Sequence, residues 1–416
     1  MIRMRRQYWL SLILVILIIC HALYIIYNKV GKKDFGYKVV VCIPVYGQSY
    51  ALGEEAKRIT DFDSLRIKYK GRIVTENLDH RFGYFDYSDA RVALRRLLQI
   101  HNKSFELSVY SMAETLADKL GKDTLICIFP GGQGLTDIAR MSKGTIPYYR
   151  FLKNINKAYT YSKKRHWKFV IPAICWMQGE SDIADYPGTD YKKLLQKFSR
   201  DINYDIKQIT RQKENVQIVC YQTSTITKGI RYVENNYDGS ESFPSQAQME
   251  LVRDDSLFWA SGPTYPYSFV REDLHIDAES QRFHGKLASR SVLDILRKGY
   301  RFQGLVPLSP KIDGDIIFLP MIVPQSPLLF DTIAVNKAPH YGFSVISKEN
   351  IDIIDDVIMH NDTLIISCVK SPIGCKLRYG INGEYMKSGR RIGPRGNLRD
   401  SQSPYPNWCY FFDICL

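Results

Sequence analysis

The sequence lacks the patterns that mark several large protein classes. None of its nine cysteines stands in C-x-x-C spacing, which argues against a structural zinc site. It has no zinc-finger spacing, no RNP-type motif and no sustained basic helix, so its formal net charge of +14 does not indicate nucleic-acid binding. Internal repeats and low-complexity tracts are also missing. With 45% hydrophobic and 24% charged residues, the chain has the composition of a globular protein rather than a disordered one.

Charged residues are absent from residues 8–27, an apolar run of 20 positions near the N-terminus. A helix of this length, at about 1.5 Å per residue, spans the hydrocarbon layer of a bilayer. We therefore expect residues 1–34 to contain a transmembrane anchor and a linker, with the rest of the chain outside the cytoplasm. A cleaved signal peptide is the alternative, and the protein would then be secreted.

Short apolar runs alternate with helix-like segments from residue 35 to about residue 300. The runs show no period-2 alternation, which is typical of parallel strands covered on both faces; they lie at 38–45, 124–129, 169–176 and 216–221. The helix-like segments lie at 106–120, 147–163, 189–211 and 278–297, the last after a potential N-cap at Asp277. This alternation predicts a doubly wound α/β domain over residues 35–300.

The composition changes in residues 301–416. Prolines and glycines become frequent, the apolar runs are short, and no long helical pattern appears, which predicts a small β-rich C-terminal domain. Two cysteine pairs in this region, Cys368 with Cys375 and Cys409 with Cys415, can form disulfides in an oxidising compartment, and the sequence leaves both pairings open.

Polar and glycine-rich segments follow the predicted strands. Ser49 follows the first strand in the context Gly47-Gln48-Ser49, which differs from the G-x-S-x-G elbow of α/β-hydrolases. Residues 130–138 (PGGQGLTDI) follow the second strand, and residues 178–182 (QGESD) follow the third. Each segment alone predicts little more than a turn. Because the carboxyl ends of parallel strands share one edge, however, the segments together supply a nucleophile, backbone donors and a side-chain amide at one place.

His275 completes this set from a loop just ahead of the last predicted helix. Glu272 and Asp273 stand beside it in "REDLH". A serine, a histidine and an acid, with hydrogen-bond donors nearby, are the groups that acyl transfer requires.

The combination resembles the SGNH/GDSL-like hydrolases, in the branch of sialate O-acetylesterases and acetylxylan esterase-related carbohydrate acetylesterases. That branch carries G-Q-S-N, a block similar to G-G-T-x-I, a Q-G-E-x-D block and a terminal D-x-x-H. Here the corresponding segments are 47–49, 134–138, 176–182 and 273–275. The resemblance covers residues 38–298 and implies a flavodoxin-like three-layer sandwich with a central parallel sheet, without a metal or organic cofactor.

The resemblance also implies roles for individual residues. Ser49 would be the nucleophile and His275 the general base. The orienting acid is Glu272 by its spacing from the histidine or Asp273 by its residue type, and the choice stays open. The expected oxyanion-hole donors are the Ser49 and Gly134 backbone N–H groups and the Gln178 amide, and the expected supporting residues are Gln48, Glu180 and Asp182.

Two further departures from the branch pattern are Tyr50, where asparagine is usual, and Leu135, where glycine is usual. The resemblance implies hydrolysis of O-acetyl groups on sialic acid or a polysaccharide through an acetyl-Ser49 intermediate. Two alternatives are a membrane-anchored polysaccharide O-acetyltransferase with the same triad, and a non-catalytic glycan-binding envelope protein that retains the motifs.

Overall fold

The computed structural model describes residues 16–19, 21, 37–75, 80–81, 84–85, 95–96, 105–184, 190–226 and 243–416. The predicted membrane anchor at residues 8–27 lies largely outside the described residues. Within these ranges, no helix combines the length and the apolar character needed to cross a bilayer.

A mostly parallel sheet forms the centre of the α/β part. Its strand order is β10-β9-β8-β1-β6-β2-β5, and only the edge strand β5 pairs in antiparallel fashion, with β2. A further strand, β7 (Lys168–Val170), pairs with the start of β1. The bounds of the other strands are β1 Val39–Gly47, β2 Ile73–Thr75, β5 Arg95–Arg96, β6 Thr124–Gly132, β8 Ala173–Met177, β9 Gln217–Gln222 and β10 Phe258–Pro263.

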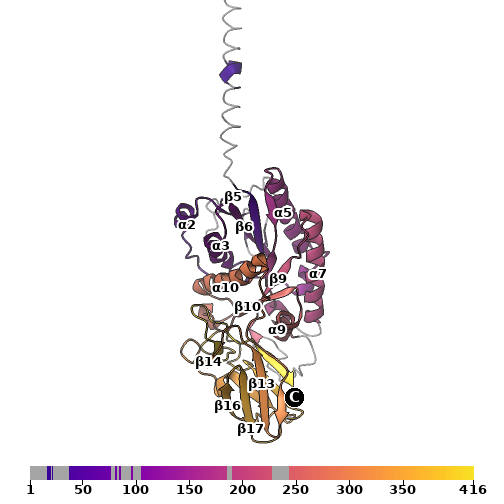
Figure 1. Ribbon diagram of the computed structural model, residues 1–416, viewed down its shortest axis with the longest axis vertical. Coiled ribbons are helices and arrows are strands. Elements are labelled where there is room, and N and C mark those ends of the chain that lie inside the picture. The colour runs from indigo at the N-terminus through magenta and orange to yellow at the C-terminus, as the bar shows by residue number, and fades with distance from the viewer. Residues whose placement is uncertain are drawn as a thin grey trace, which may run out of the picture.

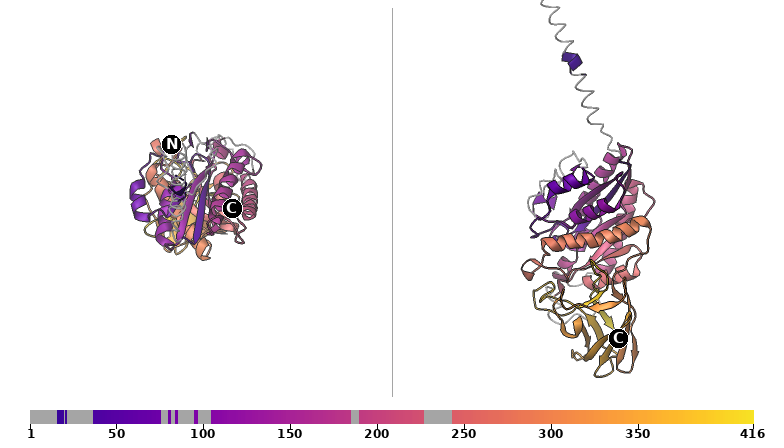
Figure 2. Two further views of the ribbon diagram at one scale, coloured as in Figure 1. Left: turned by 90° about the horizontal axis from the view of Figure 1, so that it is seen from above. Right: turned by 60° about the vertical axis from the view of Figure 1, so that its left-hand side comes forward.

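Helices cover both faces of this sheet (Figure 1 and Figure 2). One face carries α5 (Ile146–Lys163) and α7 (Tyr191–Thr210), and the other carries α3 (Ser108–Lys119) and α10 (Ala278–Arg297). The remaining helical elements are α2 (Phe62–Tyr69), α4 (Ile138–Met141), α6 (Glu180–Ala184) and α9 (Pro244–Asp254). A small hairpin pairs β3 (His80–Arg81) with β4 (Tyr84–Phe85). The α/β fold with a central parallel sheet is therefore confirmed.

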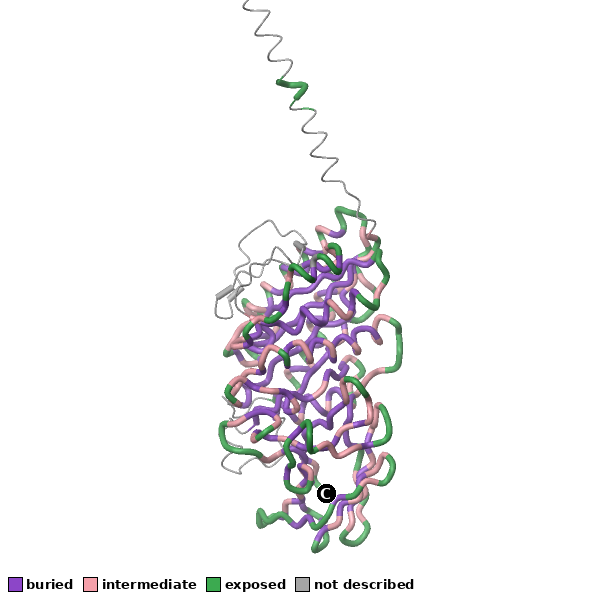
Figure 3. Tube along the Cα trace, turned by 90° about the vertical axis from the view of Figure 1, so that its left-hand side faces the viewer, coloured by how far each residue is buried: buried purple, intermediate pink, exposed green. Residues whose placement is uncertain are grey.

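The sequence explains the layers. Strand β1 is buried from Val40 to Gly47, because helices cover it on both sides and its residues are almost all apolar. In α7 the buried residues recur every three or four positions, as a helix with one face on a sheet requires; they include Leu195, Phe198, Ile202 and Ile206. The helix predicted at 278–297 is found with the same bounds, and Asp277 caps it by accepting a hydrogen bond from the Ser280 N–H. Figure 3 shows the resulting concentration of buried residues in the middle of the α/β part.

The C-terminal region consists of short antiparallel strands, as the sequence predicts. One sheet has the order β11-β13-β17-β16 with β12 paired to β13, and a second has the order β15-β18-β20, while β14 pairs with β19. Their bounds are β11 Val306–Pro307, β12 Lys311–Asp313, β13 Ile316–Ile322, β14 Leu328–Phe330, β15 Phe343–Ile346, β16 Ile354–His360, β17 Thr363–Cys368, β18 Lys376–Tyr379, β19 Leu398–Asp400 and β20 Phe412–Cys415. A 3₁₀ turn at Pro339–Gly342 precedes β15. The eight described cysteines are free thiols, so neither of the pairings left open by the sequence is formed in the structure.

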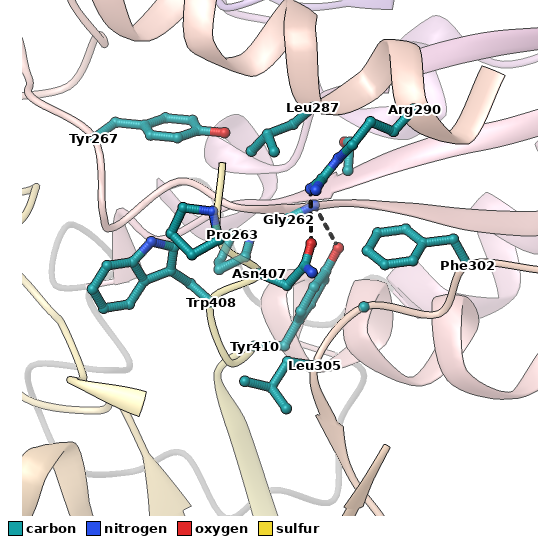
Figure 4. Close-up of a pocket in the computed structure, with 13 residues that line it drawn as sticks. Gly262, Pro263, Tyr267, Leu287, Arg290, Phe302, Leu305, Asn407, Trp408 and Tyr410 are labelled. Atoms are coloured by element: carbon teal, nitrogen blue, oxygen red, sulfur yellow. Dashed lines mark hydrogen bonds between the residues drawn. The ribbon is translucent and has the colours of Figure 1, made fainter. Parts of the chain in front are cut away.

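Buried and partly buried hydrogen bonds hold this region against the α/β part. The Gln222 side chain at the end of β9 accepts from the Phe411 N–H and donates to the Phe411 carbonyl, both at 2.8 Å. Arg290 on α10 donates to Asn407 at 2.7 Å, and the Gly262 N–H donates to the Tyr410 hydroxyl at 2.9 Å (Figure 4). Separating the two parts would break these hydrogen bonds, including the two that the completely buried Gln222 amide makes with Phe411.

Candidate active site

Ser49 lies in a tight turn directly after β1. The turn begins with hydrogen bonds from the Ala51 N–H to the Gln48 carbonyl and from the Leu52 N–H to the Ser49 carbonyl, at 3.0 and 3.1 Å. Gly47 makes the turn possible, because a Cβ there would lie 1.9 Å from the Met177 carbonyl oxygen on the neighbouring strand β8. The sharp strand-to-turn bend thus leaves the serine at the carboxyl edge of the sheet.

His275 meets Ser49 directly. Its Nε2 lies 2.9 Å from Ser49 Oγ, although 226 positions separate the two residues. The histidine loop is closed by a 2.8 Å hydrogen bond from the Val270 N–H to the His275 carbonyl. Tyr50, the departure from the usual asparagine, is buried and donates its hydroxyl hydrogen to the Leu274 carbonyl, which ties the turn of the serine to the loop of the histidine.

The carboxylate that contacts His275 belongs to Glu55. Its Oε2 lies 2.7 Å from His275 Nδ1, and its Oε1 accepts a hydrogen bond from the Arg271 guanidinium. The hydrogen bond with His275, followed by the contact with Arg271, lowers the pKa of the Glu55 carboxyl below its usual value. Serine, histidine and glutamate therefore form a continuous chain of hydrogen bonds.

Glu272 and Asp273, the two expected acids, do not occupy this position. The Glu272 carboxylate lies 3.9 Å from the Arg391 guanidinium. The Asp273 N–H donates to the Val270 carbonyl at 3.1 Å, within the short 3₁₀ turn Val270–Glu272. The physical reason is the backbone: Arg271 and Glu272 have φ angles of 55° and 54°, which turn this stretch back on itself ahead of the histidine. The carboxylate beside His275 Nδ1 comes instead from the turn that holds Ser49.

Two of the three expected oxyanion donors are available. Within the described part of the chain, the backbone N–H groups of Ser49 and Gly134 have no hydrogen-bond acceptor. The Gly134 loop is closed by a 2.9 Å bond from the Thr136 hydroxyl to the Gly134 carbonyl. The Ser49 N–H is also at the start of a helical turn, where free N–H groups favour a negative ligand.

Gln178 differs from the expectation. Its side chain is completely buried, and its Nε2 donates to Asp182 Oδ2 and, at 3.2 Å, to the Thr136 carbonyl. Its Oε1 accepts from the Tyr191 hydroxyl at 3.0 Å. The two hydrogens of the amide are thus used inside the protein, so Gln178 supports the 134–138 loop and has no hydrogen left for an oxyanion.

Gln48 joins the serine turn to the strand beside it. Its Oε1 accepts from the Gly179 N–H at 3.4 Å and from the Ser181 N–H at 3.2 Å, so it links the ends of β1 and β8.

Glu180 and Asp182 are buried acids behind the site. Both Glu180 oxygens lie 2.6 Å from the Tyr221 hydroxyl, and burial raises the pKa of Glu180. Asp182 Oδ2 accepts from the Ile138 N–H at 3.0 Å, and burial raises the pKa of Asp182 to about 7. Both acids contact the scaffold of the edge loops. Among the described residues, no cluster of His, Cys, Asp or Glu side chains could hold a metal ion.

A serine, a histidine and a carboxylate in hydrogen-bond contact at the carboxyl edge of a parallel sheet are the arrangement of a serine hydrolase. Residues 88–294 match the family described as "Carbohydrate esterase, sialic acid-specific acetylesterase". The chain belongs to this family and is a carbohydrate acetylesterase. The match begins after Ser49 and Glu55, so their contacts with His275 come from the structure alone.

Solved structures with a similar fold include another esterase. The carbohydrate acetylesterase XAC1771 from Xanthomonas citri is 14% identical, with a TM-score of 0.59, and the alignment covers 90% of this chain and 80% of that one. NanS is 15% identical, with a TM-score of 0.44, over 63% of this chain and 99% of NanS. A protein from Arabidopsis thaliana is 16% identical, with a TM-score of 0.42, over 61% and 97%. In a search of curated proteins, none matches the chain by sequence.

Proposed function

We propose that the protein removes O-acetyl groups from a carbohydrate through a covalent acetyl-Ser49 intermediate, with Glu55 as the acid of the triad. The observation that supports it is the chain of contacts from Ser49 Oγ to His275 Nε2, at 2.9 Å, and from His275 Nδ1 to Glu55 Oε2, at 2.7 Å. These distances are those of a nucleophile held by its base and of a base held by its orienting acid.

In the acylation step, Ser49 Oγ attacks the acetyl carbonyl carbon while His275 Nε2 takes the hydroxyl proton. Glu55 keeps the proton of His275 on Nδ1 and stabilises the imidazolium that forms. The negative charge on the carbonyl oxygen is met by the Ser49 and Gly134 N–H groups. When the tetrahedral intermediate collapses, the C–O bond to the sugar breaks and His275 returns its proton to the leaving sugar hydroxyl.

In the deacylation step, water takes the place of the sugar. His275 removes a proton from the water, which attacks the acetyl-serine carbonyl. When the second tetrahedral intermediate collapses, the bond from the acetyl carbon to Ser49 Oγ breaks, His275 returns its proton to Ser49 Oγ, and acetate leaves.

The substrate class follows from the family, and we propose O-acetylated sialic acid or an acetylated polysaccharide. The test measures acetate released from an O-acetylated sialic acid and from acetylated xylan by wild type, Ser49→Ala and His275→Ala. Wild type should release acetate from one of them, and both variants should be inactive. A fluorophosphonate probe should label Ser49 in wild type only. Absence of both labelling and acetate release would support a non-catalytic glycan-binding protein, and an acetyl group transferred to an added glycan would support an acetyltransferase.

We also propose that residues 8–27 anchor the protein to a membrane with the esterase outside the cytoplasm. The support is the uncharged length of this segment in the sequence. In a bacterial host, an alkaline phosphatase fused after residue 36 should be active and should sediment with membranes. An active fusion in the soluble periplasmic fraction would indicate a cleaved signal peptide, and an inactive one would contradict the proposed location.

A further inference from the structure

The loop that carries His275 is short and held in an uncommon backbone conformation. The Asp277 N–H donates to the Ser268 carbonyl at 3.0 Å, and a bridge pairs Phe269 with Ile276, so residues 268–277 form a closed loop. Inside it, Arg271 and Glu272 both adopt left-handed φ angles, of 55° and 54°. Such angles are unfavourable for residues with a Cβ and persist only where surrounding contacts hold them.

This backbone conformation brings Arg271 to Glu55. The two oxygens of the Glu55 carboxylate are divided: Oε2 faces His275 Nδ1 at 2.7 Å, and Oε1 accepts from the Arg271 guanidinium. A carboxylate on a turn can rotate about its terminal torsion, which is broad for glutamate. A donor on each oxygen removes this freedom and keeps the plane of the carboxylate aligned with the histidine.

The C-terminal region contacts the same loop. The Ser388 N–H donates to the Glu272 carbonyl at 3.0 Å, and Ser388 is completely buried. Gly389 packs so closely that a Cβ there would lie 2.8 Å from Phe269 Cδ2 and 3.2 Å from the Tyr267 carbonyl oxygen. The left-handed Glu272 is therefore fixed from a part of the chain more than one hundred positions later.

We propose that Arg271 is a positioning residue that aligns Glu55 with His275, and that the C-terminal region maintains this alignment through the contact of Ser388 and Gly389 with the histidine loop. The role gives the β-rich region a function in catalysis beyond its own folding. It rests on the proposed triad of Ser49, His275 and Glu55. Arg271 acts through Glu55, so its contribution should disappear when the Glu55 carboxylate is absent.

A double-mutant cycle on 4-nitrophenyl acetate tests the first half, with wild type, Arg271→Ala, Glu55→Gln and the double variant. Arg271→Ala should lower kcat about fivefold with little change in KM, which is the scale of an ion pair with an exposed arginine. Arg271→Lys should recover part of the loss, and Arg271→Ala should cost nothing further in the Glu55→Gln background. An equal loss in both backgrounds, or a rise in KM alone, would overturn the positioning role.

Two glycines of the C-terminal region test the second half. Gly389→Ala forces a Cβ against Phe269 and should lower kcat, with no further loss when combined with Arg271→Ala. The matched control is Gly374→Ala, which also has a positive φ (+78°) but would place its Cβ 3.6 Å from the nearest side chain, Lys348, so kcat should be unchanged. Equal kcat values for the two variants would contradict the contact's role.

Hydrogen exchange of wild type, and its turnover and labelling at Ser49, test the proposal where a variant alone does not. If Gly389→Ala does not fold, hydrogen exchange of wild type replaces it: the amide protons of Ser388, Val270 and Asp273 should be released with one opening free energy. If the Ser388 amide stays protected while the Val270 and Asp273 amides exchange, the C-terminal region does not open together with the histidine loop, and the proposed coupling is contradicted. If wild type shows neither turnover nor fluorophosphonate labelling at Ser49, the proposed esterase function fails, whereas an active enzyme with an additive cycle removes only the positioning role.

Discussion

Glu55 Oε2 lies 2.7 Å from His275 Nδ1, although 220 positions separate the two residues. Glu55 belongs to the turn that also holds Ser49. A 3.1 Å hydrogen bond from the Glu54 N–H to the Ser49 carbonyl closes this turn. The nucleophile and the carboxylate are thus parts of one local structure, and the histidine loop is inserted between them from the other end of the α/β part. The site is complete only with that loop in place.

Glu55→Gln should lower kcat by about 10²–10⁴-fold, because the neutral amide neither stabilises the imidazolium nor fixes the tautomer of His275. The matched variants are Glu272→Gln and Asp273→Asn, which change the two acids beside the histidine and should retain activity within a few fold. Steady-state hydrolysis of 4-nitrophenyl acetate measures all three. A larger loss in Asp273→Asn than in Glu55→Gln would return the acid to the position expected from the sequence.

The positions of Ser49 and His275 could be predicted because each stands next to a recognisable element, and because the segments together form a pattern that no single one shows. Ser49 follows an apolar run that is typical of a covered strand, and His275 precedes a helix with a recognisable cap at Asp277. Glu55 carries no such signal. Its approach to His275 depends on a turn that ends with Glu55 itself at φ 60°, and no residue pattern in residues 50–55 indicates that conformation.

Gln178 shows a second limit of sequence reasoning. An amide at the end of a strand predicts a donor at the sheet edge, but where its hydrogens go depends on Asp182 and Thr136, which come from two other segments. The helix α9 and the strand β10 are absent from the sequence prediction for a related reason. Their segments, PSQAQMELVRD and FWASGP, are short or mixed in polarity, and their burial comes from packing against neighbours.

Gln178→Ala should destabilise the protein more than it slows the chemistry. Its removal would take the donor from the Thr136 carbonyl and one of two donors from Asp182 Oδ2, which keeps the Ile138 N–H. A buried group left without its hydrogen bond typically costs about 1–3 kcal/mol. Urea unfolding should show this loss. An oxyanion donor would behave differently, with a fall in kcat of about 10²–10³-fold at unchanged stability, and that outcome would restore Gln178 to the oxyanion hole.

Gly47→Ala should disrupt the site by separating two strands. The added Cβ would lie 1.9 Å from the Met177 carbonyl oxygen, and neither backbone can move without breaking the pairing of β1 with β8. We expect a destabilisation of about 3 kcal/mol or more, together with loss of turnover. Gly134→Ala is the matched control, since nothing lies within 4 Å of a Cβ there and the backbone N–H is kept. Its stability should stay close to wild type; loss of stability in Gly134→Ala alone would contradict the packing described here.

Asp182 should make stability depend on pH in a direction opposite to that of most carboxylates. Burial raises its pKa in the folded protein to about 7, whereas an unfolded aspartate has a pKa of about 3.9. Between these values the folded state holds a proton that the unfolded state has lost. The free energy of unfolding contributed by this group therefore falls as pH rises from about 4 to 7, with a limiting slope of about 1.4 kcal/mol per pH unit.

Asp182→Asn removes this ionisation and keeps an oxygen that can accept from the Ile138 N–H. The stability of wild type relative to this variant, from urea unfolding at pH 4.5, 6 and 8, should therefore decrease with pH. His284 provides the contrast, because burial lowers its pKa to about 4, so the unfolded state binds the extra proton below pH 6.5. The free energy of unfolding of wild type, relative to that of His284→Gln, should increase as pH rises from 4.5 to 6. If the Asp182→Asn difference is the same at all three pH values, Asp182 is ionised in the folded protein at acid pH, and the water-excluding packing behind the 134–138 loop is not as tight as the structure describes.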